Sequence, residues 1–164
     1  MAAAPPGSPQ DRSRFMREAL RLASESARAG GGPFGAVVVK GGEIIARGAN
    51  RVTASRDPTA HAEIEAIREA CRVLDSFQLD GCVVYSSTEP CPMCMGALYW
   101  ARPERVFYAS GREVAARAGF DDQFIYDELA RPVGERRLET RPLAIEGSGE
   151  EFDAWAEYEG RVEY

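Results

Sequence analysis

Hydrophobic and polar positions alternate with two different periods along the chain, so the sequence predicts helices and strands in turn. After Ser8, apolar residues recur every three or four positions, and the pairing of Ser8 with Asp11 is typical of a helix start. This helix is predicted to end at the glycines that begin with Gly30. Two runs rich in valine and isoleucine follow, at 34–40 and 43–49, and they predict strands joined by a tight two-glycine turn.

Strands and helices continue to alternate through the second half of the chain. A polar loop at 50–60 leads into a helix whose predicted buried face shows three- and four-residue steps: Ile64, Ile67, Cys71 and Leu74. The continuous apolar run 82–86 predicts a central strand that is covered on both faces. The remaining predicted elements are a helix at 91–100, a strand at 105–109, a helix at 124–129, a strand at 137–145 and a helix at 150–159. This order predicts an α/β fold with a partly parallel sheet between two layers of helices.

Length and composition indicate a single soluble domain and a cellular location. The 164 residues fit one domain, and 45% hydrophobic with 28% charged residues is typical of a soluble globular protein. No apolar run approaches a membrane span, and no secretory signal is recognisable, so we expect a cytoplasmic protein. In the reducing cytoplasm, four cysteines point to metal binding or catalysis rather than to disulfides. The net charge of −6 argues mildly against a polynucleotide substrate.

The chemistry of the chain concentrates in two short motifs. The single histidine, His61, lies two residues before Glu63, and Cys91 and Cys94 follow in a Pro-Cys-x-x-Cys motif. A Cys-x-x-Cys pair alone also fits a redox pair or half of a structural zinc site. Combined with His-x-Glu, it matches the signature of zinc-dependent deaminases, in which imidazole and thiolates hold the metal and the glutamate does not.

The number of ligands separates a catalytic from a structural zinc. At standard helix and strand rises, Cys71 is expected about 15 Å from His61, and Cys82 more than about 15 Å from the metal, so we interpret both as inert core thiols. Three protein ligands leave a fourth position for water, which is the catalytic pattern. Glu63 can then serve as the proton carrier only if His61 lies in or just before the first helical turn, with the helix cap near Asp57-Pro58. A core histidine with a solvated glutamate remains the plainer interpretation of either residue alone.

With these motifs in place, the chain resembles the cytidine-deaminase-like superfamily and, more narrowly, its bacterial guanine deaminases. The segments that carry the resemblance are 57–63, 89–97, 32–36, 98–103, 118–122 and the final Glu163-Tyr164. The resemblance implies a three-layer α/β/α sandwich with a five-stranded mixed sheet. It also implies one zinc ion per subunit and hydrolysis of guanine to xanthine and ammonia.

The resemblance also assigns roles to individual residues. It implies that zinc is held by His61, Cys91 and Cys94, and that protons are carried by Glu63 and Asp122. It implies that the purine is bound by Phe34, Asn50, Ala62, Trp100 and Tyr164. For Asp122, a helix cap is an equally good interpretation, and aromatic residues such as Trp100 often belong to the core.

The resemblance further implies a homodimer in which residues 149–164 reach the partner's site. Residues 1–10 are expected to be a disordered N-terminus, and residues 11–148 to form the deaminase domain. Three other functions stay open: a tRNA adenosine deaminase, a guanosine or aminotriazine deaminase, and a non-catalytic zinc-binding module. A small-molecule purine is the expected partner, with nucleic acid and membrane not expected.

Overall fold

The computed structural model describes residues 8–164 in two compact units, one that ends at Asp122 and one that comprises Gln123–Tyr164. Unit 1 therefore ends earlier than the predicted domain boundary at residue 148. Of the N-terminal stretch 1–10 predicted to be disordered, residues 1–7 lie outside the described residues. Pro9 and Gln10 are helical, which corrects the prediction for that end of the stretch. No helix between residues 8 and 164 is long and apolar enough to cross a membrane.

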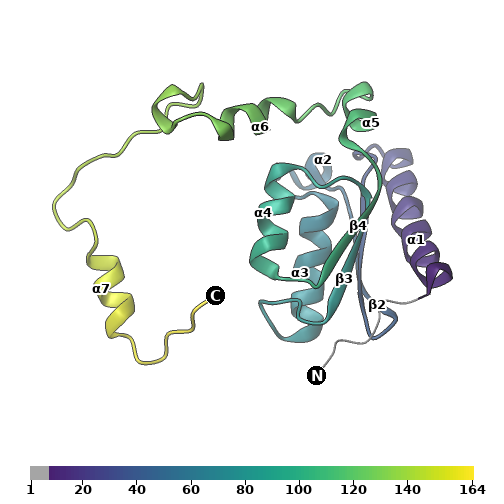
Figure 1. Cartoon of the computed structure of the whole chain (residues 1–164), viewed down its shortest axis with the longest axis horizontal. Coiled ribbons are helices and arrows are strands. Elements are labelled where there is room, and N and C mark those ends of the chain that lie inside the picture. Colours follow the sequence, from purple (N-terminus) through teal and green to yellow (C-terminus); the bar gives the residue numbers. More distant parts are fainter. Residues whose placement is uncertain (1–7) are drawn as a thin grey trace. The chain divides into compact units, whose positions relative to one another are not determined.

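Unit 1 is a mixed sheet between two layers of helices. Its elements are α1 (Pro9–Arg28), β1 (Gly35–Lys40), β2 (Glu43–Ala49), α2 (Val52–Ser55), α3 (Ala62–Leu74), β3 (Cys82–Thr88), α4 (Pro92–Ala101), β4 (Arg105–Ser110) and α5 (Arg112–Arg117). The strand order is β2-β1-β3-β4, and β3 runs parallel to β4 while the other pairs are antiparallel. Helix α1 covers one face of the sheet, and α3 and α4 cover the other (Figure 1). The predicted α/β/α sandwich is confirmed.

Local sequence accounts for the N-terminal half of this architecture. The Asp11 N–H donates to the Ser8 hydroxyl over 3.2 Å, and the Ser8 N–H donates to the Asp11 carboxylate over 3.1 Å, so the predicted capping box is present. Gly41 and Gly42 both have positive φ, +59° and +84°, as the tight turn between β1 and β2 requires. Phe15 of α1 packs on the sheet beside Tyr85 of β3.

Helix α3 approaches the sheet through alanines, which differs from the predicted face. Its fully buried apolar residues are Ala62, Ala66 and Ala70, whereas the predicted face is only half-buried: Ile64, Ile67, Cys71 and Leu74. Opposite them on β2 lies Gly48, where an added Cβ would lie 2.0 Å from the Ala62 carbonyl oxygen. Small residues on both sides let the two backbones come close, so the start of α3 is fixed directly against the sheet.

The structure differs from the prediction in three elements: it contains two short helices that were not predicted, and it lacks one predicted strand. Helix α2 is a single turn inside the predicted loop, and α5 was not predicted. The strand predicted at 137–145 is wrong, because this segment contains Pro142, pairs with no strand and leaves Leu138 and Leu143 80% and 85% exposed. The sheet of the described residues accordingly has four strands where the resemblance implied five.

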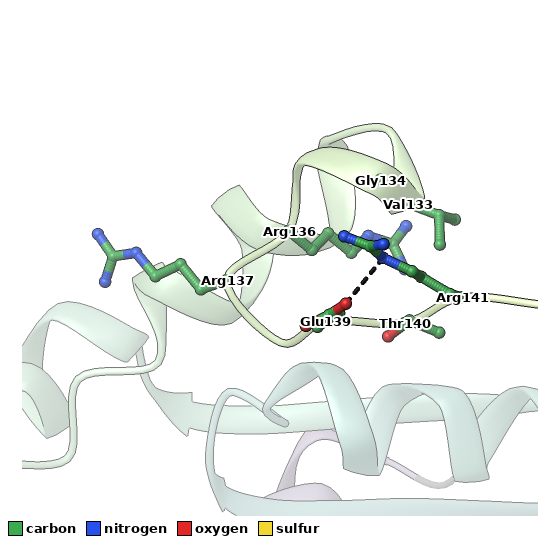
Figure 2. A pocket seen from close by; sticks show the side chains of 7 residues that line it. All are labelled: Val133, Gly134, Arg136, Arg137, Glu139, Thr140 and Arg141. Carbon is green, nitrogen blue, oxygen red and sulfur yellow. Dashed lines mark ion pairs between the residues drawn. The ribbon is translucent and has the colours of Figure 1, made fainter.

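Unit 2 is built of short helices with long connections. Its elements are α6 (Gln123–Ala130), the 3-10 helix η1 (Val133–Glu135) and α7 (Glu150–Glu157). An open pocket follows η1 and is lined mainly by charged side chains, among them Arg136, Arg137 and Arg141 (Figure 2). Glu139 pairs with Arg141 across 2.8 Å. Every residue of unit 2 is at least partly exposed.

Candidate active site and metal centre

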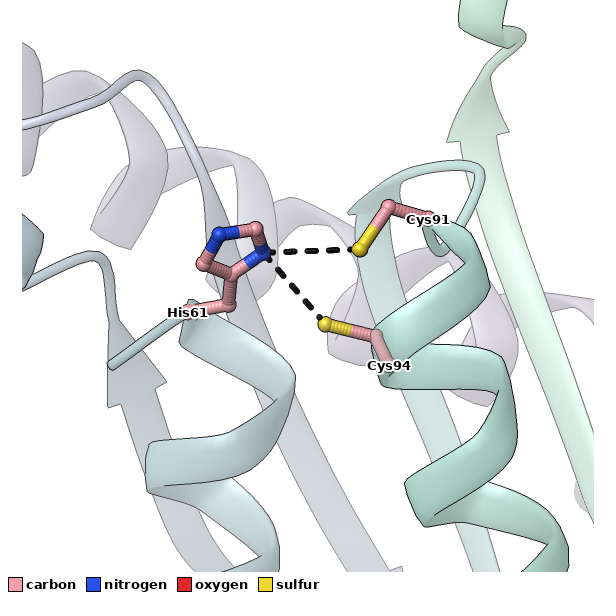
Figure 3. A group of neighbouring side chains, drawn as sticks. All are labelled: His61, Cys91 and Cys94. Carbon is pink, nitrogen blue, oxygen red and sulfur yellow. Dashed lines mark hydrogen bonds between the residues drawn. The ribbon is translucent and has the colours of Figure 1, made fainter. Parts of the chain in front are cut away.

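Two helix starts bring the predicted metal ligands together. His61 is the N-cap residue of α3, and Cys91 is the N-cap residue of α4. Both have extended backbone, with ψ of 158° and 168°, and neither side chain caps its own helix. Cys94 lies one turn into α4, and Figure 3 shows the three side chains pointing toward one another. The motif spacing therefore produces a convergent cluster because each motif coincides with a helix start.

The distances in this cluster fit a tetrahedral zinc ion. The His61 Nδ1 lies 3.6 Å from the Cys91 Sγ and 3.5 Å from the Cys94 Sγ, and the three ligand atoms lie within 4.8 Å of one another. A tetrahedron with Zn–S near 2.3 Å and Zn–N near 2.0 Å has N–S edges of about 3.5 Å. One imidazole and two thiols are also the donor set that zinc prefers. The predicted zinc site is confirmed.

No fourth protein ligand joins this group among residues 8–164. Cys82 is buried in the core between the sheet, α3 and α4, and Cys71 packs against that same core. These two cysteines are structural, as predicted. A three-residue ligand set leaves one tetrahedral corner for a small molecule, so the geometry favours a catalytic over a structural zinc.

Hydrogen bonds within the cluster prepare one cysteine as a thiolate. The Cys94 thiol and then His61 hydrogen-bond to Cys91, which lowers the pKa of Cys91 to about 4 despite its partial burial. The same hydrogen bond, together with burial, raises the pKa of Cys94. Without metal the two cysteines therefore hold one proton between them, and zinc binding displaces it. The hydrogen bond with Cys91 also raises the pKa of His61, which must be neutral to bind metal.

Glu63 reaches the centre because His61 stands outside the helix. Residues two apart within a helix diverge, but His61 is extended and Glu63 is the second helical residue, so both side chains converge. The helix cap is His61 itself, not the predicted Asp57-Pro58, because α3 begins only at Ala62. The Asp57 carboxylate instead accepts the Thr59 N–H.

The Glu63 carboxyl is held at both oxygens and is only 6% exposed. The Ser86 hydroxyl donates to Oε1 over 2.9 Å, and the Cys94 thiol lies 3.5 Å from Oε2. Burial raises the pKa of Glu63 above the usual value of a glutamate. A carboxyl with a raised pKa beside an open metal position is suited to taking up and returning a proton.

Two of the predicted substrate residues lie on loops of unit 1. The Asn50 Oδ1 accepts the backbone N–H groups of Gly32 and Val52, each over 3.3 Å. Phe34 meets Phe120 edge-on, with ring centroids 5.0 Å apart. This contact joins the segment before β1 to the segment after α5.

The other predicted site residues differ in burial and in the unit to which they belong. Burial and then the negative charge of Cys91 raise the pKa of Asp122. Ala62 is fully buried against the sheet, which leaves only its backbone for a ligand. Trp100 is 64% exposed near the end of α4, about 9 Å along the helix from Cys94. Tyr164 belongs to unit 2.

Two residues of the site were missed in the sequence. Ser86 occupies the buried middle of β3, and a serine in a strand carries no signal by itself. Glu89 accepts the backbone N–H of Arg112 over 3.2 Å and so links the loop before Cys91 to the start of α5. Its only sequence signal is its place directly before the Pro-Cys motif.

The metal ligands and Glu63 fall within a region that is shared with known proteins. Residues 9–110 match the cytidine and deoxycytidylate deaminase zinc-binding region, which spans both motifs and all four strands. The chain belongs to this deaminase family. The resemblance seen in the motifs is thereby confirmed.

Similarity to individual deaminases extends over different lengths of the chain. This deaminase is 54% identical to the guanine deaminase of Bacillus subtilis (strain 168) over 151 residues, which are 92% of this chain and 97% of that protein. A solved structure of guanine deaminase from Bacillus subtilis matches it with a TM-score of 0.90 at 53% identity, over 93% of this chain and 98% of that one. The tRNA-specific adenosine deaminase of Aquifex aeolicus (strain VF5) is 47% identical over 96 residues, 58% of this chain and 64% of that protein.

Proposed function

We propose that this protein is a zinc-dependent aminohydrolase that converts guanine and water to xanthine and ammonia. The observation that carries this proposal is the three-ligand cluster of His61, Cys91 and Cys94, with the buried Glu63 carboxyl directed at it. Together with the 54% identity to a guanine deaminase over 92% of the chain, it specifies both the reaction and the substrate.

The residues of unit 1 divide the work of the reaction among them. His61 and the two cysteines would hold the zinc ion, which would supply a nucleophile at neutral pH by lowering the pKa of water. The Glu63 Oε2 takes a proton from that water and passes it to the purine ring nitrogen beside the attacked carbon. The second proton of the attacking water passes by way of Asp122 to the departing amine, which leaves as ammonia. Asn50 orients the purine by donating from its Nδ2 to a purine acceptor.

Guanine is favoured over tRNA adenosine by the length of chain that is shared. The match to the Bacillus subtilis guanine deaminase covers 151 residues, more than the 122 of unit 1, so it extends into unit 2. The match to the Aquifex aeolicus tRNA deaminase covers 96 residues. The net charge of −6 also disfavours a polyanionic substrate. Unit 2 therefore belongs with the guanine activity.

We further propose that the protein acts as a homodimer in which residues 149–164 cover the partner's site and Tyr164 approaches the purine. Unit 2 supports this proposal because its large apolar side chains are exposed, among them Phe124, Phe152 and Tyr158. A segment of this size cannot bury a core of its own. A reducing compartment such as the cytoplasm suits the site, since zinc needs Cys91 and Cys94 as thiolates.

Ammonia release from the purified zinc protein tests the substrate. The assay should compare guanine, guanosine, adenine, cytosine, ammeline and a tRNA at equal concentration. We expect release to be fastest from guanine and insensitive to salt between 50 and 200 mM, as expected for an uncharged base. Faster release from tRNA, with a steep fall as salt rises, would contradict the proposal.

A further inference from the structure

The general acid–base Glu63 depends on a neighbour for its orientation. The last torsion of a glutamate side chain is soft, so burial alone does not fix the plane of its carboxyl group. In this site the two oxygens have different surroundings. Oε1 accepts the Ser86 hydroxyl over 2.9 Å, and Oε2 lies 3.5 Å from the Cys94 Sγ at the metal centre. The oxygen bound by Ser86 is therefore the one turned away from the reaction.

The Ser86 hydroxyl is itself carried by a central strand of the sheet. Strand β3 is paired on both sides, and Ser86 lies opposite Ala36 of β1 and Tyr108 of β4. Its side chain is 2% exposed, so no water competes for the hydrogen bond. A donor on a central strand gives a more precise anchor than a donor on a loop.

We infer that Ser86 is a positioning residue that fixes the Glu63 carboxyl through Oε1 so that Oε2 faces the metal centre. The inference rests on the proposed function. Ser86 binds neither metal nor substrate in this assignment, so its loss should slow the proton transfers without weakening the binding of zinc or guanine. Partners of this kind typically contribute 10- to 100-fold to activity.

Strand β3 supplies a matched control in the next residue. Ser87 is as buried as Ser86, and its hydroxyl accepts the backbone N–H of Gly35 over 3.0 Å. Because side chains alternate along a strand, Ser87 points to the opposite face of the sheet from Glu63. Ser86→Ala and Ser87→Ala each remove one buried hydroxyl from adjacent positions, but only the first removes a partner of the catalytic carboxyl.

The test measures kcat, KM for guanine, zinc content and thermal midpoint of the full-length zinc protein and its variants. We expect Ser86→Ala to lower kcat 10- to 100-fold, with KM within threefold of the parent value and one zinc per chain. Ser87→Ala should lower the thermal midpoint by a similar amount and leave kcat within twofold. If Ser87→Ala shifts the backbone at Gly35, the shift should change KM and not kcat.

A second pair of variants separates the hydroxyl from the shape of the side chain. Threonine and valine have the same shape and differ in the hydroxyl, so Ser86→Thr should keep kcat within threefold, while Ser86→Val should lose as much as Ser86→Ala. This pair decides the question if Ser86→Ala does not fold. Equal kcat in the Thr and Val variants, or a kcat of Ser86→Ala within twofold of the parent, would overturn the inference. A parent without activity on guanine would overturn the proposed function instead, and the same ratios would then be measured on the base that releases ammonia fastest.

Discussion

The close contact of β2 with α3 predicts that one methyl group will weaken the zinc site. A Cβ added at Gly48 would lie 2.0 Å from the Ala62 carbonyl oxygen and 2.6 Å from the Ala66 nitrogen. Both are backbone atoms, which cannot rotate away as a side chain could. To reach an ordinary contact of 3.4 Å from that oxygen, helix and strand must separate by about 1.4 Å.

Gly48→Ala is expected to lower both the stability of the protein and its hold on zinc. Overpacking of this kind costs about 1–3 kcal/mol, which for a chain of this length lowers the thermal midpoint by roughly 2–12 °C. The displaced helix also carries His61 and Glu63. A misplacement near 1 Å can cost about 100-fold in rate. We therefore expect Gly48→Ala to lose zinc to a chelator that leaves the parent loaded, and to lose most of its activity.

Gly35→Ala is the matched control for this experiment. Its Cβ would lie 2.3 Å from the Ala19 carbonyl oxygen and 2.6 Å from the Ala23 nitrogen, so the clash is of the same kind. It displaces α1, which carries no metal ligand. Gly35→Ala should lower the thermal midpoint similarly and retain zinc. If Gly48→Ala holds zinc as tightly as Gly35→Ala does, the coupling of β2 packing to the metal centre is refuted.

Three further outcomes are expected. Because the pKa of Cys91 is lowered to about 4, it should be the first cysteine that iodoacetamide alkylates at pH 6 in the zinc-free protein. Zinc should protect Cys91 from this reaction. Labelling at Cys71 instead would refute the thiolate assignment. Hydrogen bonds from Arg21 and Arg47 lower the pKa of Glu18 to about 2, so its stabilising effect is complete above pH 4.5 and is lost as the pH falls toward 2. The urea midpoint of Glu18→Gln should accordingly lie below that of the parent at pH 7 and approach it at pH 2, and a constant difference would contradict this. Finally, a chain lacking residues 149–164 should be inactive alone and regain activity when co-expressed with full-length Glu63→Gln, and no recovery in the mixed dimers would reject the exchange of this segment.

Features that depend on neighbours in sequence could be predicted from the sequence. The capping box at Ser8 and the turn at Gly41-Gly42 are local, and both are present. The metal ligands were predictable because each motif fixes two residue types at a set spacing. His61 and Cys91 then occupy equivalent positions at two helix starts.

Features that depend on tertiary contacts could not be predicted in the same way. The predicted face of α3 does pack on the core through Ile67, Cys71 and Leu74, but its fully buried alanines were missed, because hydrophobic periodicity favours isoleucine and leucine whereas the close approach to Gly48 selects alanine. The strand predicted at 137–145 has apolar residues but finds no partner strand. The role of Ser86 depends on β3 lying beneath the start of α3, which the sequence around Ser86 does not contain.

Zinc content and ammonia release of Glu63→Gln, measured on the same preparation, test the catalytic centre most directly. Glutamine keeps the size of the side chain and the acceptor for Ser86, but it cannot carry the proton. The three-ligand site predicts one zinc per chain, as in the parent, and guanine turnover lowered by at least 100-fold. Turnover within tenfold of the parent, or loss of the zinc together with the activity, would contradict the assignment of Glu63 as the proton carrier beside a site built by His61, Cys91 and Cys94.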